Sequence, residues 1–202
     1  MCRSPATARF IATKLATYFV ADVPRASLVD RLAAAFLRTD GNITALLRLL
    51  FLAPELDVAL ASGMRKFKDQ MQFVVSSLRL AYSGRTVGNL RPAIGWLNQL
   101  SQPLYCRVTP DGYPLTESAW ASAGQMIKHF MIARAIGSGQ AELLTGDDGK
   151  PLRTGSPKLA GQLYYDAIEG LLGPAKPRVL GQTFSQPEWN TALLSSPEWI
   201  QR

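Results

Sequence analysis

Pro5-Ala-Thr-Ala-Arg-Phe-Ile-Ala-Thr-Lys-Leu15 opens the stretch, continuing to Pro54-Glu55, that decides the fold of this chain. Apolar side chains recur along it every three to four residues, which is the spacing of amphipathic helices. In residues 7–21 this pattern predicts a buried stripe of Phe10, Ile11, Leu15, Tyr18 and Phe19. Two further helical patterns follow with almost no spacer, so we expect a closely packed helical array that begins inside a domain.

The residues between the helical patterns predict turns and helix caps. Asp40-Gly41-Asn42 predicts a turn in which the glycine adopts positive φ and Asn42 caps the next helix. The echo Ser185-Gln-Pro-Glu-Trp189 and Ser195-Ser-Pro-Glu-Trp-Ile200 predicts two further helix starts with a serine at or near each N-cap. We interpret residues 62–69, which carry Arg65, Lys66 and Lys68, as a polar hinge.

The rest of the chain continues the helical pattern, and no segment alternates apolar and polar residues as a half-buried strand does. Further helices are predicted over residues 70–82, 92–100, 117–136 and 158–172. Proline and glycine predict a long irregular loop near 101–116, and residues 137–157 predict a flexible loop. The fold class is therefore all-α, a compact orthogonal multi-helix bundle forming a single domain over residues 1–202.

Composition and charge favour some classes of protein over others. The apolar share of 47% and charged share of 18% are those of a globular chain. The formal net charge of +7 comes from basic residues scattered along the sequence, whereas nucleic-acid-binding proteins gather them on one face. No apolar run is long enough to predict a membrane span, and no signal peptide is recognisable.

Residues for metal or cofactor chemistry are sparse. His129 is the one histidine, and it lies on an amphipathic helix with few carboxylates nearby, so we interpret it as a packed or surface residue. Cys2 and Cys106 can pair in an oxidising compartment, but their spacing does not require it, and we interpret them as unpaired thiols. The sequence predicts no cofactor and no metal.

Candidate catalytic residues come from the first three helical patterns. Carboxylates stand at helix ends, where they commonly stabilise N-termini or form turns, and two of them could meet in a cleft. The four carboxylates at helix ends are those of Asp22, Asp30, Asp40 and Glu55. Lys14 lies beside the apolar stripe and can extend from the edge of the core. Lys14, Asp22 and Asp40 are therefore the first residues to test for catalysis.

Short motifs follow one another in a defined order along the chain. They are Pro5–Leu15, Tyr18–Asp22, Thr39-Asp-Gly41, Lys66-Phe-Lys68, Phe73–Arg79, Gln102-Pro103, Pro110-Asp-Gly-Tyr-Pro114 and Ser196–Arg202. In this order the set resembles the bacterial "domain of unknown function 1800" family over essentially the whole chain. The chain departs from the family pattern at Ser4, Gln70, Gln72 and Ser101.

The resemblance implies a bacterial protein whose relatives are often exported. Because family members are considerably longer, it also implies that this chain corresponds to the C-terminal half of a longer family domain. The family has no agreed activity, so the resemblance supplies no catalytic residue.

Three functions remain open from the sequence. The leading one is a non-enzymatic helical module that binds a partner protein, a second copy or a missing N-terminal half. The second is an enzyme of unknown class, such as a hydrolase, with a pocket between the first three helices and the 101–116 loop. The third is a weak nucleic-acid-binding module, since residues 27–51 resemble a helix-turn-helix in length, although Arg48 is the one basic residue of its second helix.

Overall fold

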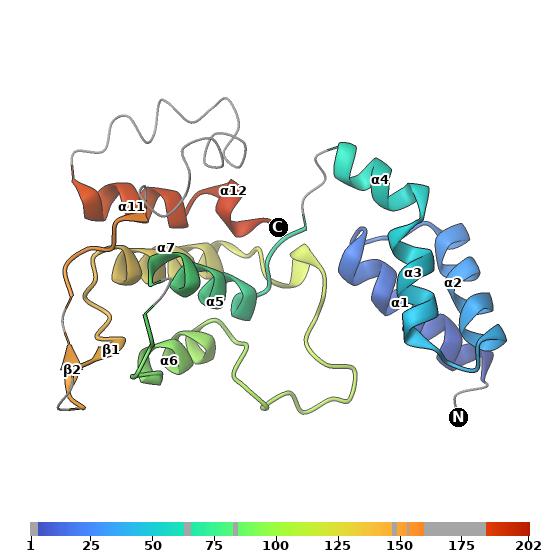
Figure 1. Cartoon of the computed structure of the whole chain (residues 1–202), viewed down its shortest axis with the longest axis horizontal. Helices are drawn as coiled ribbons and strands as arrows, with labels where there is room; N and C mark the ends of the chain where they lie inside the picture. Colours follow the sequence, from blue (N-terminus) through green and yellow to red (C-terminus); the bar gives the residue numbers. More distant parts are fainter. Residues whose placement is uncertain (1–3, 63–65, 83–84, 147–148, 153, 160–184) are drawn as a thin grey trace. The chain divides into compact units, whose positions relative to one another are not determined.

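The computed structural model describes residues 4–62, 66–82, 85–146, 149–152, 154–159 and 185–202. The secondary structure of these residues is almost entirely helical (Figure 1), which confirms the all-α class. The chain divides into two compact units, which are Met1–Phe67 with Pro114–Ala119, and Lys68–Tyr113 with Trp120–Arg202. The interpretation of residues 1–202 as one domain stays a prediction.

The first unit contains four α-helices, drawn in blue to cyan in Figure 1. They are α1 (Pro5–Phe19), α2 (Ala26–Arg38), α3 (Ile43–Phe51) and α4 (Pro54–Ala61), with the short 3₁₀ helix η1 (Glu117–Ala119). α1 packs along α2, and α2 along α3. Leu28, Leu32, Leu46 and Leu50 are fully buried in the core that these helices enclose.

The buried face of α1 differs from the predicted stripe. Ala8, Ala12 and Ala16 are fully buried, whereas Phe10 is half exposed. Ile11, Leu15 and Phe19 pack against this core from its edge. The predicted stripe consisted of the most hydrophobic side chains of the segment. In the structure α1 instead turns its alanines toward α2, because alanines spaced four residues apart allow the backbones of the two helices to approach closely.

The turn between α2 and α3 has the predicted conformation. Gly41 has a φ of 84°, and Asp40 also lies in the left-handed region, at 52°. The Asn42 side chain accepts a hydrogen bond from the Ala45 N–H at 3.2 Å, which confirms Asn42 as the cap of α3.

The second unit is built around two neighbouring helices, α5 (Gln70–Ala81) and α7 (Ala123–Gly137). It also contains α6 (Arg91–Gln99), α11 (Gln186–Leu194) and α12 (Pro197–Ile200). The single helix predicted over residues 117–136 is wrong, because η1 ends at Ala119 and α7 begins only at Ala123. Ser122 explains the break, since its hydroxyl accepts the Gln125 N–H and caps α7.

α11 runs along α7 (Figure 1), and one buried amide forms hydrogen bonds at this contact. Asn190 on α11 donates to the carbonyl oxygens of Gly137 at 2.9 Å and Pro157 at 2.7 Å. A Cβ atom at Gly137 would lie 2.9 Å from the Asn190 Cβ, so this close approach requires glycine. Ser185 and Ser196 accept the N–H groups of Glu188 and Trp199, which confirms both predicted caps.

Residues 137–157 contain an antiparallel hairpin that the sequence pattern did not predict. β1 (Leu144–Thr145) pairs with β2 (Pro151–Leu152). Leu143 and Leu144 are buried, so part of this segment packs into the core of the second unit. The predicted flexibility of residues 137–157 stays a prediction. Strands of two residues are too short to produce a recognisable alternation in the sequence. The helix predicted over residues 158–172 lies almost entirely outside the described residues.

Candidate functional site

Lys66 and Lys68 are both buried, although the sequence predicted a polar hinge for this segment. The two side chains belong to different units, because the unit boundary falls between Phe67 and Lys68. Buried lysines are rare in proteins unless something compensates their charge. Each lysine therefore needs a physical explanation.

Lys66 is compensated within the first unit. Its ammonium group forms an ion pair and hydrogen bond with the Asp22 carboxylate, and it also donates to the Leu115 carbonyl oxygen at 3.2 Å. The second carboxylate oxygen of Asp22 accepts the Glu117 N–H at 2.6 Å. Asp22 and Lys66 together attach residues 115–117 to the end of α1, which gives this polar cluster a structural role.

Asp22 therefore supports a stability prediction. The change Asp22→Ala leaves the Lys66 ammonium and the Glu117 N–H without this acceptor. We expect the free energy of unfolding to fall by about 2 kcal/mol, which is less than the loss expected for a fully buried pair, because Asp22 is one-third exposed. Urea unfolding measures this change. The control Asp30→Ala removes an exposed pair with Arg9 and should cost less than about 1 kcal/mol. Equal losses in the two variants would contradict the prediction.

The other predicted catalytic residues lie elsewhere in the first unit. The Lys14 amine sits 5.2 Å from the centre of the Phe10 ring, one turn back along α1. Asp40 occupies the left-handed position of the α2–α3 turn. Among the other carboxylates considered, Asp30 accepts from Arg9, and Glu55 accepts two hydrogen bonds from Arg31. Catalysis by Lys14, Asp22 or Asp40 stays a prediction.

Lys68 has a different environment in the second unit. Its ammonium nitrogen lies 3.8 Å from the centre of a Trp199 ring, and its backbone N–H donates to the Ile200 carbonyl oxygen at 2.8 Å. The Trp199 indole N–H donates to the Ser77 hydroxyl at 2.9 Å, which fixes the ring. Burial lowers the pKa of Lys68 to about 8 because removal of water disfavours the charged amine.

Lys68 lines a groove of about 510 Å³ along α5. Met71 and Val75 supply apolar surface in this groove, and Arg79 and Arg202 add two guanidinium groups. Among the lining residues that the structure describes, three are cationic and none is acidic. This groove is the candidate site. In the sequence, the feature that could have indicated it is Lys68, which comes directly before Asp69, the N-cap of the largely apolar helix α5.

His129, interpreted from the sequence as a packed or surface residue, is buried against α5. Its Nε2 is hydrogen-bonded to the Gln70 side-chain oxygen, and its ring stacks on Phe73 with centroids 4.2 Å apart. Burial lowers the pKa of His129 to about 4. The imidazole is therefore neutral near pH 7.

Cys106 is exposed and forms no disulfide, whereas Cys2 lies outside the described residues. Over the described ranges, no group of three or more potential metal-ligating side chains is present. Of the helices described, none is both long and apolar enough to cross a membrane.

Fold and groove together define an all-α protein with a cationic, partly apolar groove on one of its central helices. The family model described as "Protein of unknown function (DUF1800)" matches residues 1–201. The chain therefore belongs to this family, and the family predicted from the ordered motifs is confirmed. The match gives no support to the narrower expectation of a C-terminal half. No curated protein and no solved structure shows significant similarity to the chain.

Proposed function

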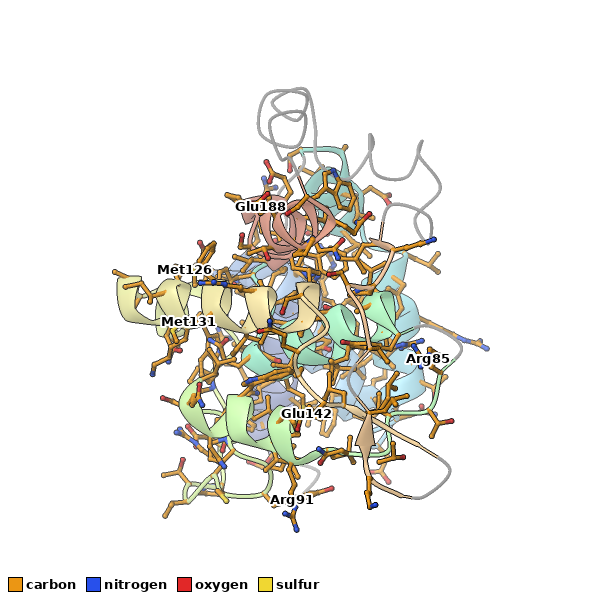
Figure 2. The ribbon with its side chains drawn as sticks, turned by 90° about the vertical axis from the view of Figure 1, so that its left-hand side faces the viewer. Arg85, Arg91, Met126, Met131, Glu142 and Glu188 are labelled. Carbon is orange, nitrogen blue, oxygen red and sulfur yellow. The ribbon has the colours of Figure 1, made fainter. Side chains whose placement is uncertain are left out.

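We propose that this protein is a non-enzymatic helical module that binds a partner protein through the outer face of α7. The observation that supports this most strongly is the exposure of three large apolar side chains on that face, which are Ile127, Phe130 and Met131. Their spacing of three and four residues places them on one side of the helix. Figure 2 labels Met131, together with Met126, on α7.

The composition of α7 explains why this face suits a partner. The helix is apolar on nearly all sides, since Ile132, Ala133 and Ile136 are buried in the second unit while Ile127, Phe130 and Met131 are exposed. A contiguous exposed apolar face is characteristic of an interaction surface. Methionine adds flexibility that suits the packing of another helix against it.

Charge indicates the chemistry of the partner. α7 contains Lys128 and Arg134 and no acidic residue, and Arg134 is exposed one turn beyond Met131. An amphipathic helix with apolar residues on one face and glutamates at its edges would cover the apolar side chains and complement this charge. We therefore assign the surface to an acidic amphipathic helix.

The test uses a synthetic 18-residue amphipathic helix of leucine and glutamate, and a matched peptide with lysine in place of glutamate. We expect the glutamate peptide to bind in the micromolar range and the lysine peptide to bind at least about tenfold more weakly, by fluorescence anisotropy. The variant Ile127→Glu should weaken binding of the glutamate peptide about tenfold or more. The control Leu52→Glu alters an exposed apolar residue of the first unit and should leave binding unchanged.

Equal binding of the two peptides, or equal affinities of the Ile127→Glu variant and the parent, would overturn the assignment. Concentration-dependent dimerisation that Ile127→Glu abolishes, seen by light scattering without peptide, would show that a second copy occupies the surface instead.

The enzyme and nucleic-acid alternatives stay predictions. The helix-turn-helix hypothesis corresponds to α2 and α3, where Arg48 is the one basic residue of α3 and is exposed. No specific observation favours either alternative over the α7 surface.

A further inference from the structure

The groove beside Lys68 has the properties of a small-molecule site that is separate from the α7 face. Its volume of about 510 Å³ is within the range of ligand pockets. Lys68 is more than nine-tenths buried, yet it lines this groove. A buried ammonium group facing a groove is costly unless an anion approaches it.

The described residues provide no counter-ion for this ammonium group. The nearest carboxylate in the sequence, Asp69, accepts the Gln72 N–H at 2.8 Å and caps α5. The ion pairs formed by described residues involve other cations. Burial lowers the pKa of Lys68 because removal of water disfavours the charged amine. Trp199 offers its ring face 3.8 Å away, which attracts the cation but carries no net negative charge.

Backbone groups at the start of α5 do not supply the positive potential of the groove. Gln102 accepts the Met71 N–H at 2.8 Å, and Asp69 accepts the Gln72 N–H, so these two donors are already used. Positive potential in the groove comes instead from the side chains of Lys68, Arg79 and Arg202.

The surface between these cations is largely apolar. Met71 and Val75 both line the groove and are both partly exposed on α5. They lie one turn apart on α5, on the same side as Arg79, since residues 71, 75 and 79 are spaced by four. An anion without an apolar part would leave this surface uncovered.

We propose that this groove binds a small organic carboxylate with an apolar body. The carboxylate binds in the positive field of Lys68 and Arg79, and the apolar body covers Met71 and Val75. A guanidinium can hold a carboxylate through two parallel hydrogen bonds, and Lys68 adds a point charge in a poorly hydrated position.

The experiment uses the full chain with methyl-labelled methionine and follows the Met71 signal by NMR. The probes are octanoate, octylammonium and inorganic phosphate. We expect octanoate to shift the Met71 signal with a dissociation constant in the millimolar range or below, and the other two probes to bind at least about tenfold more weakly. Octylammonium tests the need for negative charge, and phosphate tests the need for an apolar body.

Variants identify the residues that bind the carboxylate. Lys68→Met and Arg79→Met should each weaken octanoate binding about tenfold. Arg79 is exposed, so its variant keeps the test valid if Lys68→Met does not fold. The matched control Arg91→Met removes an exposed cation at the start of α6, labelled in Figure 2, and should leave the affinity unchanged.

Three results would overturn the proposal. They are the absence of a Met71 shift at millimolar octanoate, equal binding of octanoate and either other probe, and an unchanged octanoate affinity in Arg79→Met.

Discussion

Replacing Phe73 with alanine is expected to lower the free energy of unfolding of the second unit by about 4 kcal/mol. Phe73 lies on α5, is fully buried, and stacks on the His129 ring of α7. Its removal loses both the burial of a large apolar side chain and the contact between two neighbouring helices. A cavity would remain, because the helices on both sides are held by other contacts.

Urea unfolding followed by tryptophan fluorescence measures this loss. Met71→Ala is the control on the same helix, because Met71 is partly exposed, and its cost should stay below about 1 kcal/mol. A loss of less than about 1 kcal/mol in Phe73→Ala would show that the α5–α7 contact is not a major part of the core.

Acidification is expected to destabilise the second unit by about 3 kcal/mol through His129. An imidazole in the unfolded chain has a pKa of about 6.5, whereas burial lowers the pKa of His129 to about 4. Between these values the unfolded chain binds a proton that the folded chain does not, so stability falls as the pH falls. The folded state therefore keeps its full stability with respect to His129 above about pH 6.5, and this part of the stability is lost by about pH 4. The difference of 2.5 pKa units corresponds to about 3 kcal/mol.

His129→Gln separates this effect from the titration of carboxylates. Glutamine does not titrate and can still form a hydrogen bond with Gln70. The stability difference between the parent and the variant should change by about 3 kcal/mol between about pH 7 and pH 4. Parallel stability curves would contradict the assignment. Because the chain has one histidine, its NMR titration gives a second measurement, in which protonation should begin only below about pH 5.

Local features of the fold were predictable from short stretches of sequence. Asn42, Ser185 and Ser196 cap helices because each side-chain oxygen reaches an N–H three residues ahead, and that distance does not depend on the rest of the chain. The positive φ of Gly41 is equally local. The ordered motifs also predicted the family that the comparison confirms.

The face that each helix buries was less predictable. α1 turns Ala8, Ala12 and Ala16 inward and leaves Phe10 half exposed, because the facing helix determines which side chains fit the contact. The boundary at Ser122 was also missed, since the apolar pattern continues across it in the sequence.

For this protein, the sequence by itself determined the all-α class, the caps, the turn at Gly41 and the family, because these depend on residues close together in the chain or on motif order. Only the tertiary structure decided that Lys66 pairs with Asp22, that Lys68 rests on Trp199 beside a cationic groove, and that His129 stacks on Phe73. The partners in these contacts are separated by between 44 and 131 positions along the chain, namely 22 and 66, 68 and 199, and 73 and 129. Burial and charge at such sites arise when distant segments pack together, and helical periodicity carries no information about which segments will meet.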